Sequence, residues 1–299
     1  MEKIKKKKIL ITGATGLLGS SLTKILKPHY NLICFNKKAF DITNKYIVKY
    51  KLKKINPNVV IHCAAYTDVD KAQIEKDIVY KVNVCGTKNL VQNLKNKKSL
   101  FIYISTDYVF SGKKRTPYSE NDRPSPINFY GKTKLEAEKE VLRLKKYIII
   151  RTSWLYGPGG KNFIETIAKL AKQKKVIEVV NDQFGSPTYT IDLSKAIKEL
   201  LDLYFKNKLP YGIYHITGRG RCSWFEFAKF AMKLINPDIK IMPVNSQKTK
   251  REAKRPKNSL LSNEKFYRLV GHYLPDWRVS VKHYIKNYLT KDLNEYFKK

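Results

Sequence analysis

The sequence predicts an α/β protein built on a doubly wound parallel sheet, followed by a smaller C-terminal region. Short apolar runs alternate with helical patterns through the first half of the chain, the order expected of parallel strands with crossover helices. A glycine-rich turn follows the first apolar run, as in sheets that bind ligands at their carboxyl edge. With 299 residues, the chain can bury a large core as one large domain or two closely joined ones.

The first half contains apolar runs typical of strands that are buried on both faces. These strands are expected at residues 9–12, 32–35, 59–64, 100–105 and 147–152. Amphipathic spacing predicts helices at residues 18–26, 45–54, 74–82, 84–94 and 130–144. Prolines mark residues 120–126 as a loop. Right-handed crossovers between successive strands would then give a parallel sheet.

The second half is less regular. Strands are expected at residues 177–180 and 213–216, and helices at 191–205, 223–234 and 282–296. The segment 243–261 has little periodicity and contains Arg255-Pro256. Long irregular segments in compact proteins often form binding loops, so we expect this one to contact a ligand.

The turn after the first strand reads Gly13-Ala14-Thr15-Gly16-Leu17-Leu18-Gly19. Glycines between a strand and a helix let a dinucleotide pyrophosphate approach the backbone, and the helix N-terminus offers free N–H groups to it. The spacing is GxxGxxG rather than GxGxxG, and alone it would also suit a tight connection. Read as a cofactor site, it predicts a Rossmann-like nucleotide-binding half.

Tyr130 and Lys134 are four residues apart on a predicted helix, where they lie on the same face. A free tyrosine titrates near pH 10, and a neighbouring ammonium group lowers that value, which makes the phenol a better proton donor at neutral pH. Thr106 follows the 100–105 strand at the same sheet edge and is expected to bind the oxygen on which charge develops. Together with the glycine turn, the three residues predict a nicotinamide-dependent oxidoreductase.

The predicted cofactor-binding and catalytic residues lie in the first half of the chain, and this sets the expected domain boundaries. Residues 1–155 are expected to form the dinucleotide-binding domain, to which the chain returns around 188–217. Residues 156–187 and 218–299 are expected to form mainly the substrate-binding region.

The formal net charge of +35 would ordinarily favour nucleic acid as a partner. Only ten of the 60 basic residues are arginine, however, and the lysines are spread along the whole chain, so we expect no nucleic-acid binding. The four cysteines show no CxxC spacing, no apolar stretch is long enough for a bilayer, and the lysine run at residues 3–8 leads directly into a strand. We therefore expect a cytoplasmic protein without a membrane partner.

Motifs along almost the whole chain carry a family resemblance. They are GATGLLG, FDIT (40–43), CAAYTDVDKA (63–72), VNVCGT (82–87), STDYVFSG (105–112), YGKTK, RTSWLYG (151–157), NDQFGSPTYTIDL (181–193), CSWFEFA (222–228) and KRPKNSLL (254–261). In this order they resemble extended short-chain dehydrogenases/reductases and, within them, dTDP-4-dehydrorhamnose reductases. The resemblance implies that a nucleotide-linked 4-keto-6-deoxy sugar is reduced to a 6-deoxyhexose such as rhamnose.

The resemblance also implies roles for individual residues. The catalytic triad of the family falls on Thr106, Tyr130 and Lys134. Its cofactor positions fall on Gly13, Gly16, Leu17, Leu18, Gly19, Asp41, Ile42, Ala64, Ala65 and Tyr66, together with Tyr130 and Lys134. Its substrate positions fall on Thr106, Asp107 and Trp154, and we add Arg255 from the irregular segment.

Some features leave alternatives open. Certain family members hold Mg²⁺ at a dimer contact through glutamates, and one of those positions is Ser21 here, so a metal site is doubtful. The oligomeric state is left open between a monomer and a homodimer. A sugar-nucleotide 4,6-dehydratase needs an Asp-Glu pair after the threonine, whereas Tyr108 follows Asp107. A regulatory subunit of methionine adenosyltransferase also keeps Tyr-x-x-x-Lys but differs around the threonine and the tryptophan. Another sugar-nucleotide reductase or epimerase is a further alternative.

The cofactor preference is predicted from the end of the second strand. Enzymes that select NAD commonly carry an acidic residue there that binds the adenosine ribose 2′-hydroxyl. Here Lys37 and Lys38 follow Asn36, and Asp41 matches the adenine-side FDIT motif instead. Two ammonium groups would attract a 2′-phosphate, so we expect NADPH to be preferred and NADH to be usable.

Overall fold

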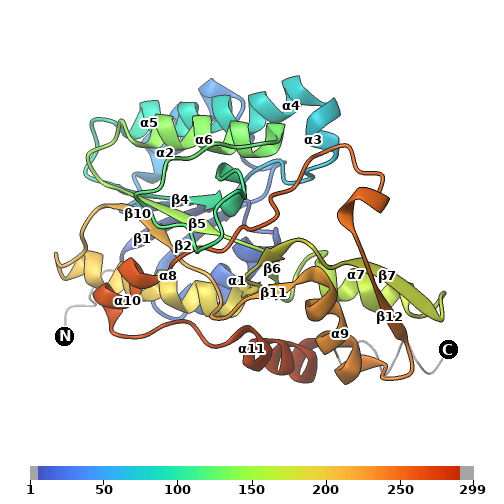
Figure 1. The fold of residues 1–299 in the computed structure, drawn as a ribbon. Coiled ribbons are helices and arrows are strands. Elements are labelled where there is room, and N and C mark those ends of the chain that lie inside the picture. The colour runs from blue at the N-terminus through green and yellow to red at the C-terminus, as the bar shows by residue number, and fades with distance from the viewer. Residues whose placement is uncertain (1–5, 290–299) are drawn as a thin grey trace.

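The computed structural model describes residues 6–289 and contains the predicted doubly wound sheet (Figure 1). Six parallel strands lie in the order β10-β5-β4-β3-β1-β2. Their bounds are Lys8–Thr12 (β1), Asn31–Phe35 (β2), Val59–His62 (β3), Leu100–Thr106 (β4), Tyr147–Thr152 (β5) and Gly212–His215 (β10). The strand order reverses beside β1, so a crevice is expected at the carboxyl ends of β1 and β3.

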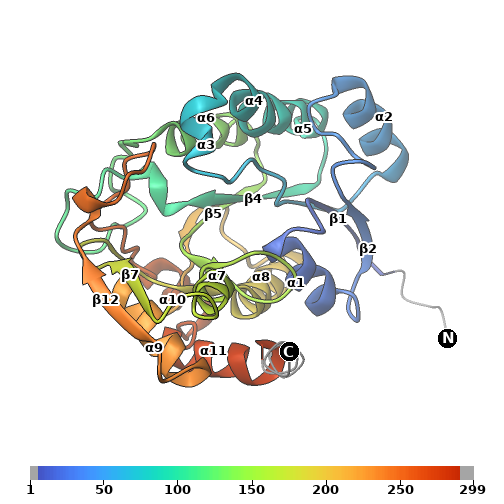
Figure 2. The same ribbon diagram turned by 90° about the vertical axis from the view of Figure 1, so that its right-hand side faces the viewer.

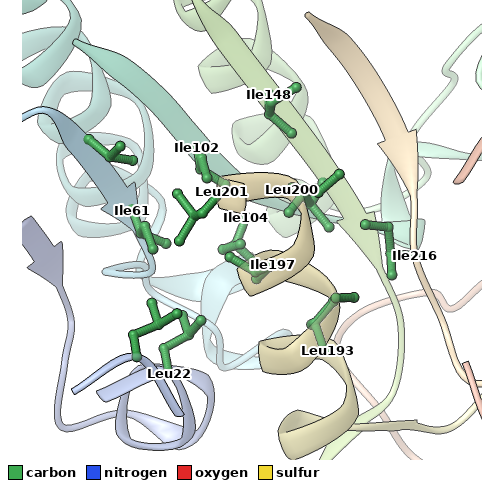
Figure 3. Packing of buried hydrophobic residues seen from close by; sticks show 14 of the residues in the cluster. Leu22, Ile61, Ile102, Ile104, Ile148, Leu193, Ile197, Leu200, Leu201 and Ile216 are labelled. Atoms are coloured by element: carbon green, nitrogen blue, oxygen red, sulfur yellow. The ribbon is translucent and has the colours of Figure 1, made fainter. Parts of the chain in front are cut away.

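Helices cover both faces of the sheet (Figures 1 and 2). One face packs against α1 (Leu17–Leu26), α8 (Thr190–Phe205) and α10 (Glu264–Val270). The other packs against α2 (Lys45–Ile55), α5 (Gly86–Leu94) and α6 (Phe129–Val141). Figure 3 shows the first of these cores, where Ile102 and Ile148 of the sheet meet Ile197 and Leu201 of α8. The strands are apolar on both faces because both faces are buried.

A second unit forms below the sheet in Figure 1, around its own aromatic core. Its helices are α7 (Phe163–Leu170), α9 (Trp224–Ile235) and α11 (Trp277–Tyr284). Its strands form three short pairs: β7 (Val176–Val180) with β12 (Lys240–Val244), β6 (Leu155–Tyr156) with β9 (Thr188–Tyr189), and β8 (Phe184–Gly185) with β11 (Cys222–Ser223). Its core includes Tyr156, Phe227 and Trp277, which are almost completely buried.

The structure corrects several expected elements. The single helix expected at 74–82 is replaced by α3 (Lys71–Ile74), α4 (Lys76–Tyr80) and the π-helical turn η1 (Lys81–Cys85), because Glu75 leaves the helical region of backbone space. The segment 243–261 is not wholly irregular, since it contains the end of β12 and the 3₁₀ turn η3 (Ser246–Lys248). The helix expected at 282–296 begins earlier, with α11, and continues as the π-helical turn η4 (Ile285–Leu289). Residues 290–296 of that expected helix, and residues 3–5 of the N-terminal lysine run, lie outside the described residues.

A buried ion pair joins three elements beneath the carboxyl edge of the sheet. Arg151 of β5 donates two hydrogen bonds to the carboxylate of Glu138 in α6, at 3.0 and 2.7 Å. Ser105 of β4 donates a third to the same carboxylate. The ion-paired side chains are each only 2% exposed. Removing either charge would leave the other buried without a partner, and that costs far more than losing a surface pair.

This pair gives a stability prediction. We expect Glu138→Ala to lower the free energy of unfolding by about 3–5 kcal/mol, because the Arg151 guanidinium would be left buried and uncompensated. The control is Glu136→Ala, which removes an exposed pair with Lys139 on the same helix and should cost about 0.5 kcal/mol or less. Urea unfolding measures both. Equal losses of unfolding free energy in the two variants would show that the Glu138–Arg151 pair stabilises no more than an exposed pair.

Candidate active site

A cavity of about 640 Å³ opens at the carboxyl edge of the sheet, where the second unit meets it. It brings together residues from the loops after β1, β2, β3 and β5 with others from β4, α1, α6 and α9. Most of the predicted site residues line it: Gly13, Gly16, Leu17, Leu18, Gly19, Lys37, Asp41, Ile42, Ala64, Ala65, Tyr66, Thr106, Asp107, Tyr130, Lys134 and Trp154. Lys38 and Arg255 are not among its lining residues.

The glycine turn lies at one end of this cavity. Gly13 has a φ of +65°, and a Cβ there would stand 2.7 Å from the backbone nitrogen of Ala64. A Cβ on Gly19 would stand 2.2 Å from the carbonyl oxygen of Gly13. Only glycine permits this close approach. Helix α1 begins at Leu17 with no side chain capping its N-terminus, so its first N–H groups can face a phosphate group.

The segment after β2 forms the adjoining wall. Lys37 is exposed and lines the cavity. The Asp41 carboxylate accepts hydrogen bonds from the backbone N–H and the hydroxyl of Thr43, at 2.9 and 2.8 Å, and so shapes the following turn. Of the two predicted lysines, only Lys37 is therefore positioned to meet a group bound in the cavity.

The predicted catalytic side chains come from α6 and the end of β4. Helix α6 is capped by Asn128, whose side chain accepts a hydrogen bond from Gly131 N–H at 2.8 Å. A Cβ on Gly131 would stand 2.1 Å from the carbonyl oxygen of Tyr108, so glycine lets the helix approach the 3₁₀ turn η2 (Asp107–Val109). This approach brings Tyr130 and Thr106 to the same cavity.

Lys134 differs from the expectation in its contacts. Its ammonium group is almost completely buried, donates a hydrogen bond to the carbonyl oxygen of Ile104 at 2.7 Å and lies 4.1 Å from the centre of the Tyr103 ring. Burial lowers the pKa of Lys134 to about 7, although the Glu138 carboxylate opposes that shift.

The expected lowering of the Tyr130 pKa by Lys134 is not found. Desolvation of the phenol instead raises the pKa of Tyr130, and the nearby Asp107 carboxyl group adds to the rise. The physical reason is that the Lys134 ammonium is directed at a backbone carbonyl and is itself destabilised by burial. The spacing in sequence could not reveal either effect.

Asn83 is a positioning residue that the sequence analysis missed. It lies on the π-helical turn η1, and its side chain exchanges two hydrogen bonds with the backbone of Tyr66, at 2.8 and 3.2 Å. Its amide also donates to the hydroxyl of Thr133, at 3.1 Å, next to Lys134 on α6. Single π turns often occur at functional sites. The only signal in the sequence is an asparagine between two valines in the VNVCGT motif.

Trp154 lies directly after β5, in a left-handed backbone conformation with a φ of +47°. This conformation is strained for a bulky residue and is concentrated at functional sites. The indole is partly buried and stacks on Trp224 of α9, with ring centres 3.5 Å apart and planes 7° from parallel. Trp224 also lines the cavity, and the sequence analysis did not select it.

Arg255 is held outside the cavity lining by an ion pair. Its guanidinium group donates two hydrogen bonds to Asp70, at 3.0 and 2.7 Å, and the backbone N–H of Ala253 donates a third to the same carboxylate, at 3.1 Å. The Asn128 side chain donates to the carbonyl oxygen of Lys254 at 2.8 Å. These contacts fasten the irregular segment to the sheet unit, and a substrate contact by Arg255 remains a prediction.

The comparisons with known proteins agree with this geometry. Residues 7–290 match the family model of the RmlD substrate binding domain. A dTDP-4-dehydrorhamnose reductase of Aggregatibacter actinomycetemcomitans is 38% identical over 285 residues, covering 92% of this chain and 97% of that protein. The chain belongs to the dTDP-4-dehydrorhamnose reductase family. The resemblance inferred from the motifs is thereby confirmed.

Two solved structures of the family show the same fold. A dTDP-4-dehydrorhamnose reductase of Bacillus anthracis, solved in complex with NADP, has a TM-score of 0.89 and 40% identity and covers 94% of this chain and 99% of its own. A family member from Clostridium acetobutylicum has a TM-score of 0.88 and 41% identity and covers 93% and 98%. The predicted Rossmann-like fold class is thereby confirmed.

The hydroxyl of Ser21, at the position where some family members carry a glutamate, is engaged with the Thr190 hydroxyl at 2.7 Å. Within residues 6–289, no group of three His, Cys, Asp or Glu side chains is arranged to hold a metal ion. Nor does this part of the chain contain a helix both long and apolar enough to span a membrane.

Proposed function

We propose that this protein reduces the C4 carbonyl of a dTDP-linked 4-keto-6-deoxy sugar, dTDP-4-dehydrorhamnose, to give dTDP-rhamnose for cell-surface polysaccharide synthesis, with NADPH as the reductant. The observation that carries the proposal is the single cavity lined by Thr106, Tyr130, Lys134 and the glycine turn. The relatives named as dTDP-4-dehydrorhamnose reductases support it and favour an enzyme over a regulatory subunit.

The cavity fits a dinucleotide. The glycines at positions 13 and 19 leave no room for a Cβ, and the uncapped N-terminus of α1 offers N–H groups to a diphosphate. Ala64, Ala65 and Tyr66 continue this wall past β3. We propose that residues 1–155, with the return at 188–217, bind the cofactor and that 156–187 and 218–299 bind the sugar nucleotide; residues 1–5 and 290–299 lie outside the described structure.

When bound, the cofactor supplies a hydride to the sugar carbon. In our proposal Tyr130 gives its phenolic proton to the oxygen at C4, which becomes an alkoxide as the hydride arrives. The Thr106 hydroxyl donates a hydrogen bond to the same oxygen. Lys134 is buried at a pKa of about 7, so the negative charge of a bound cofactor and of a developing phenolate would favour its charged form.

We further propose a cytoplasmic enzyme that acts on a nucleotide sugar as a monomer or a homodimer. All four cysteines are free thiols, which suits a reducing compartment. The net charge of +35 favours polyanionic small molecules such as nucleotide sugars.

The proposed reaction is tested by following NADPH oxidation with dTDP-4-dehydrorhamnose. We expect turnover by the wild type and a kcat about 10²–10⁴-fold lower in Tyr130→Phe, because only the proton donor is lost. The dissociation constant of NADPH should be nearly unchanged in this variant. A wild type that binds NADPH without oxidising it would contradict the function, and near-normal turnover by Tyr130→Phe would contradict the role of the tyrosine.

The cofactor preference is tested at Lys37. We expect Lys37→Ala to lower kcat/KM for NADPH about tenfold and to leave NADH little changed, because one attraction to the 2′-phosphate is removed. Lys38→Ala is the matched control, since Lys38 does not line the cavity. Equal use of both cofactors by the wild type and by Lys37→Ala would show that this lysine does not select NADPH.

Trp154 is predicted to contact the sugar. Trp154→Ala should raise KM for the sugar nucleotide about tenfold, with little change in KM for NADPH or in Tm, because its indole borders the cavity. Trp277→Phe, in the buried core of the second unit, should lower Tm without a selective effect on KM. A large Tm loss in Trp154→Ala without a change in KM would assign Trp154 to the core instead.

A further inference from the structure

Asp107 is a buried carboxyl group in the cavity wall, with no cationic partner among residues 6–289. It is 2% exposed and follows Thr106 at the end of β4. The guanidinium of Arg255, on the segment that crosses this region, is paired with Asp70 instead. The hydroxyl of Ser259 faces the carboxyl group, although its own hydrogen bond runs to the carbonyl oxygen of Phe184 at 3.3 Å.

The two carboxyl oxygens of Asp107 have unequal surroundings. Oδ1 accepts a hydrogen bond from the Thr106 hydroxyl at 3.0 Å. Oδ2 is buried and has no hydrogen-bond partner among the described residues. Burial of an unpaired carboxylate is costly, and a proton relieves that cost. Accordingly, burial raises the pKa of Asp107 to about 7, against the opposing influence of the Ser259 and Thr106 hydroxyls.

The Thr106 hydroxyl has one proton and two lone pairs. One lone pair already accepts the backbone N–H of Tyr108, at 3.2 Å. When Asp107 is ionised, the Thr106 proton is committed to Oδ1. When Asp107 is neutral, its own O–H donates across the same 3.0 Å contact to the second lone pair of Thr106. The Thr106 proton is then free to point into the cavity, on the side where the Tyr130 hydroxyl lies.

We propose that Asp107 is a positioning residue whose neutral form donates a hydrogen bond to Thr106 and thereby directs the Thr106 hydroxyl to the carbonyl oxygen of the substrate. This role rests on the proposed reduction. It specifies that the Thr106 hydroxyl donates its hydrogen bond to the developing alkoxide and not to Asp107. No bond other than hydrogen bonds changes in the step. A side chain that always offers a donor should reproduce the active form.

Other ionisable groups surround Asp107, and the test must separate them. They are Tyr108 on η2, Tyr130 and Lys134 on α6, and Arg255 with its partner Asp70 beyond Tyr108. Lys134 has a lowered pKa in the same range and is expected to affect the rate at alkaline pH. It is present in every variant below, so a ratio of rates between variant and wild type cancels its contribution.

The experiment compares kcat for Asp107→Asn, Asp107→Ala and wild type between pH 6 and 8.5. We expect the Asn variant to be slower than wild type at pH 6 and its kcat ratio to wild type to rise about tenfold by pH 8.5, because its amide stays a donor while Asp107 ionises. The Ala variant, which has no donor, should be slower than the Asn variant at every pH in this range. Asp77→Asn, an exposed carboxyl on α4, is the control and should give a constant ratio.

A second measurement does not need turnover. In protein with ¹³C-labelled aspartate, the side-chain signal that disappears in Asp107→Asn should titrate near neutral pH. A kcat ratio that stays constant with pH in Asp107→Asn, or a signal that titrates in the normal range for aspartate, would overturn the proposal. A wild type without turnover, but with this shifted titration, would contradict the proposed reaction while leaving the state of Asp107 established.

Discussion

The arrangement of the site depends on the buried ion pair between Glu138 and Arg151. Glu138 lies one turn beyond Lys134 on α6, Arg151 lies on β5, and Ser105 adds a hydrogen bond from β4 immediately before Thr106. The pair thus links α6, which carries Tyr130, to β5, and the Ser105 hydrogen bond links the same carboxylate to the end of β4, which carries Thr106. Because neither charge can be solvated where it lies, α6 and β5 cannot separate without leaving an unpaired buried ion. This constraint keeps the proposed donor groups at one place.

Above this pair, burial shifts the pKa values of the ionisable groups that line the cavity so that their neutral forms are favoured. It lowers the pKa of Lys134 and raises the pKa values of Asp107 and Tyr130. The two shifted values near 7 are not independent of what the cavity binds, since each added charge changes the field at both groups. The protonation states of Lys134 and Asp107 therefore depend on the bound ligands as well as on the neighbouring residues.

The second unit completes the site with residues that are distant in sequence. Trp224 of α9 stacks on Trp154, which follows the sheet strand β5. The segment 251–261 is tied to the sheet unit through Arg255 and Asp70. Both contacts cross between the two units, so the cavity forms only when they are packed together.

The sequence by itself determined the sheet, the glycine turn and about half of the residues that line the cavity. Apolar runs such as 100–105 predict strands because both faces of a parallel sheet are buried, and Gly19 is required because a Cβ there would meet Gly13 in the same turn. Only the tertiary structure decided the stacking of Trp224 and the position of Lys38 outside the cavity. The same holds for the hydrogen bond between Asn83 and the backbone of Tyr66 and for the direction of the Tyr130 pKa shift. Periodicity and spacing are properties of neighbours along the chain, whereas desolvation and stacking arise from residues that only folding brings together.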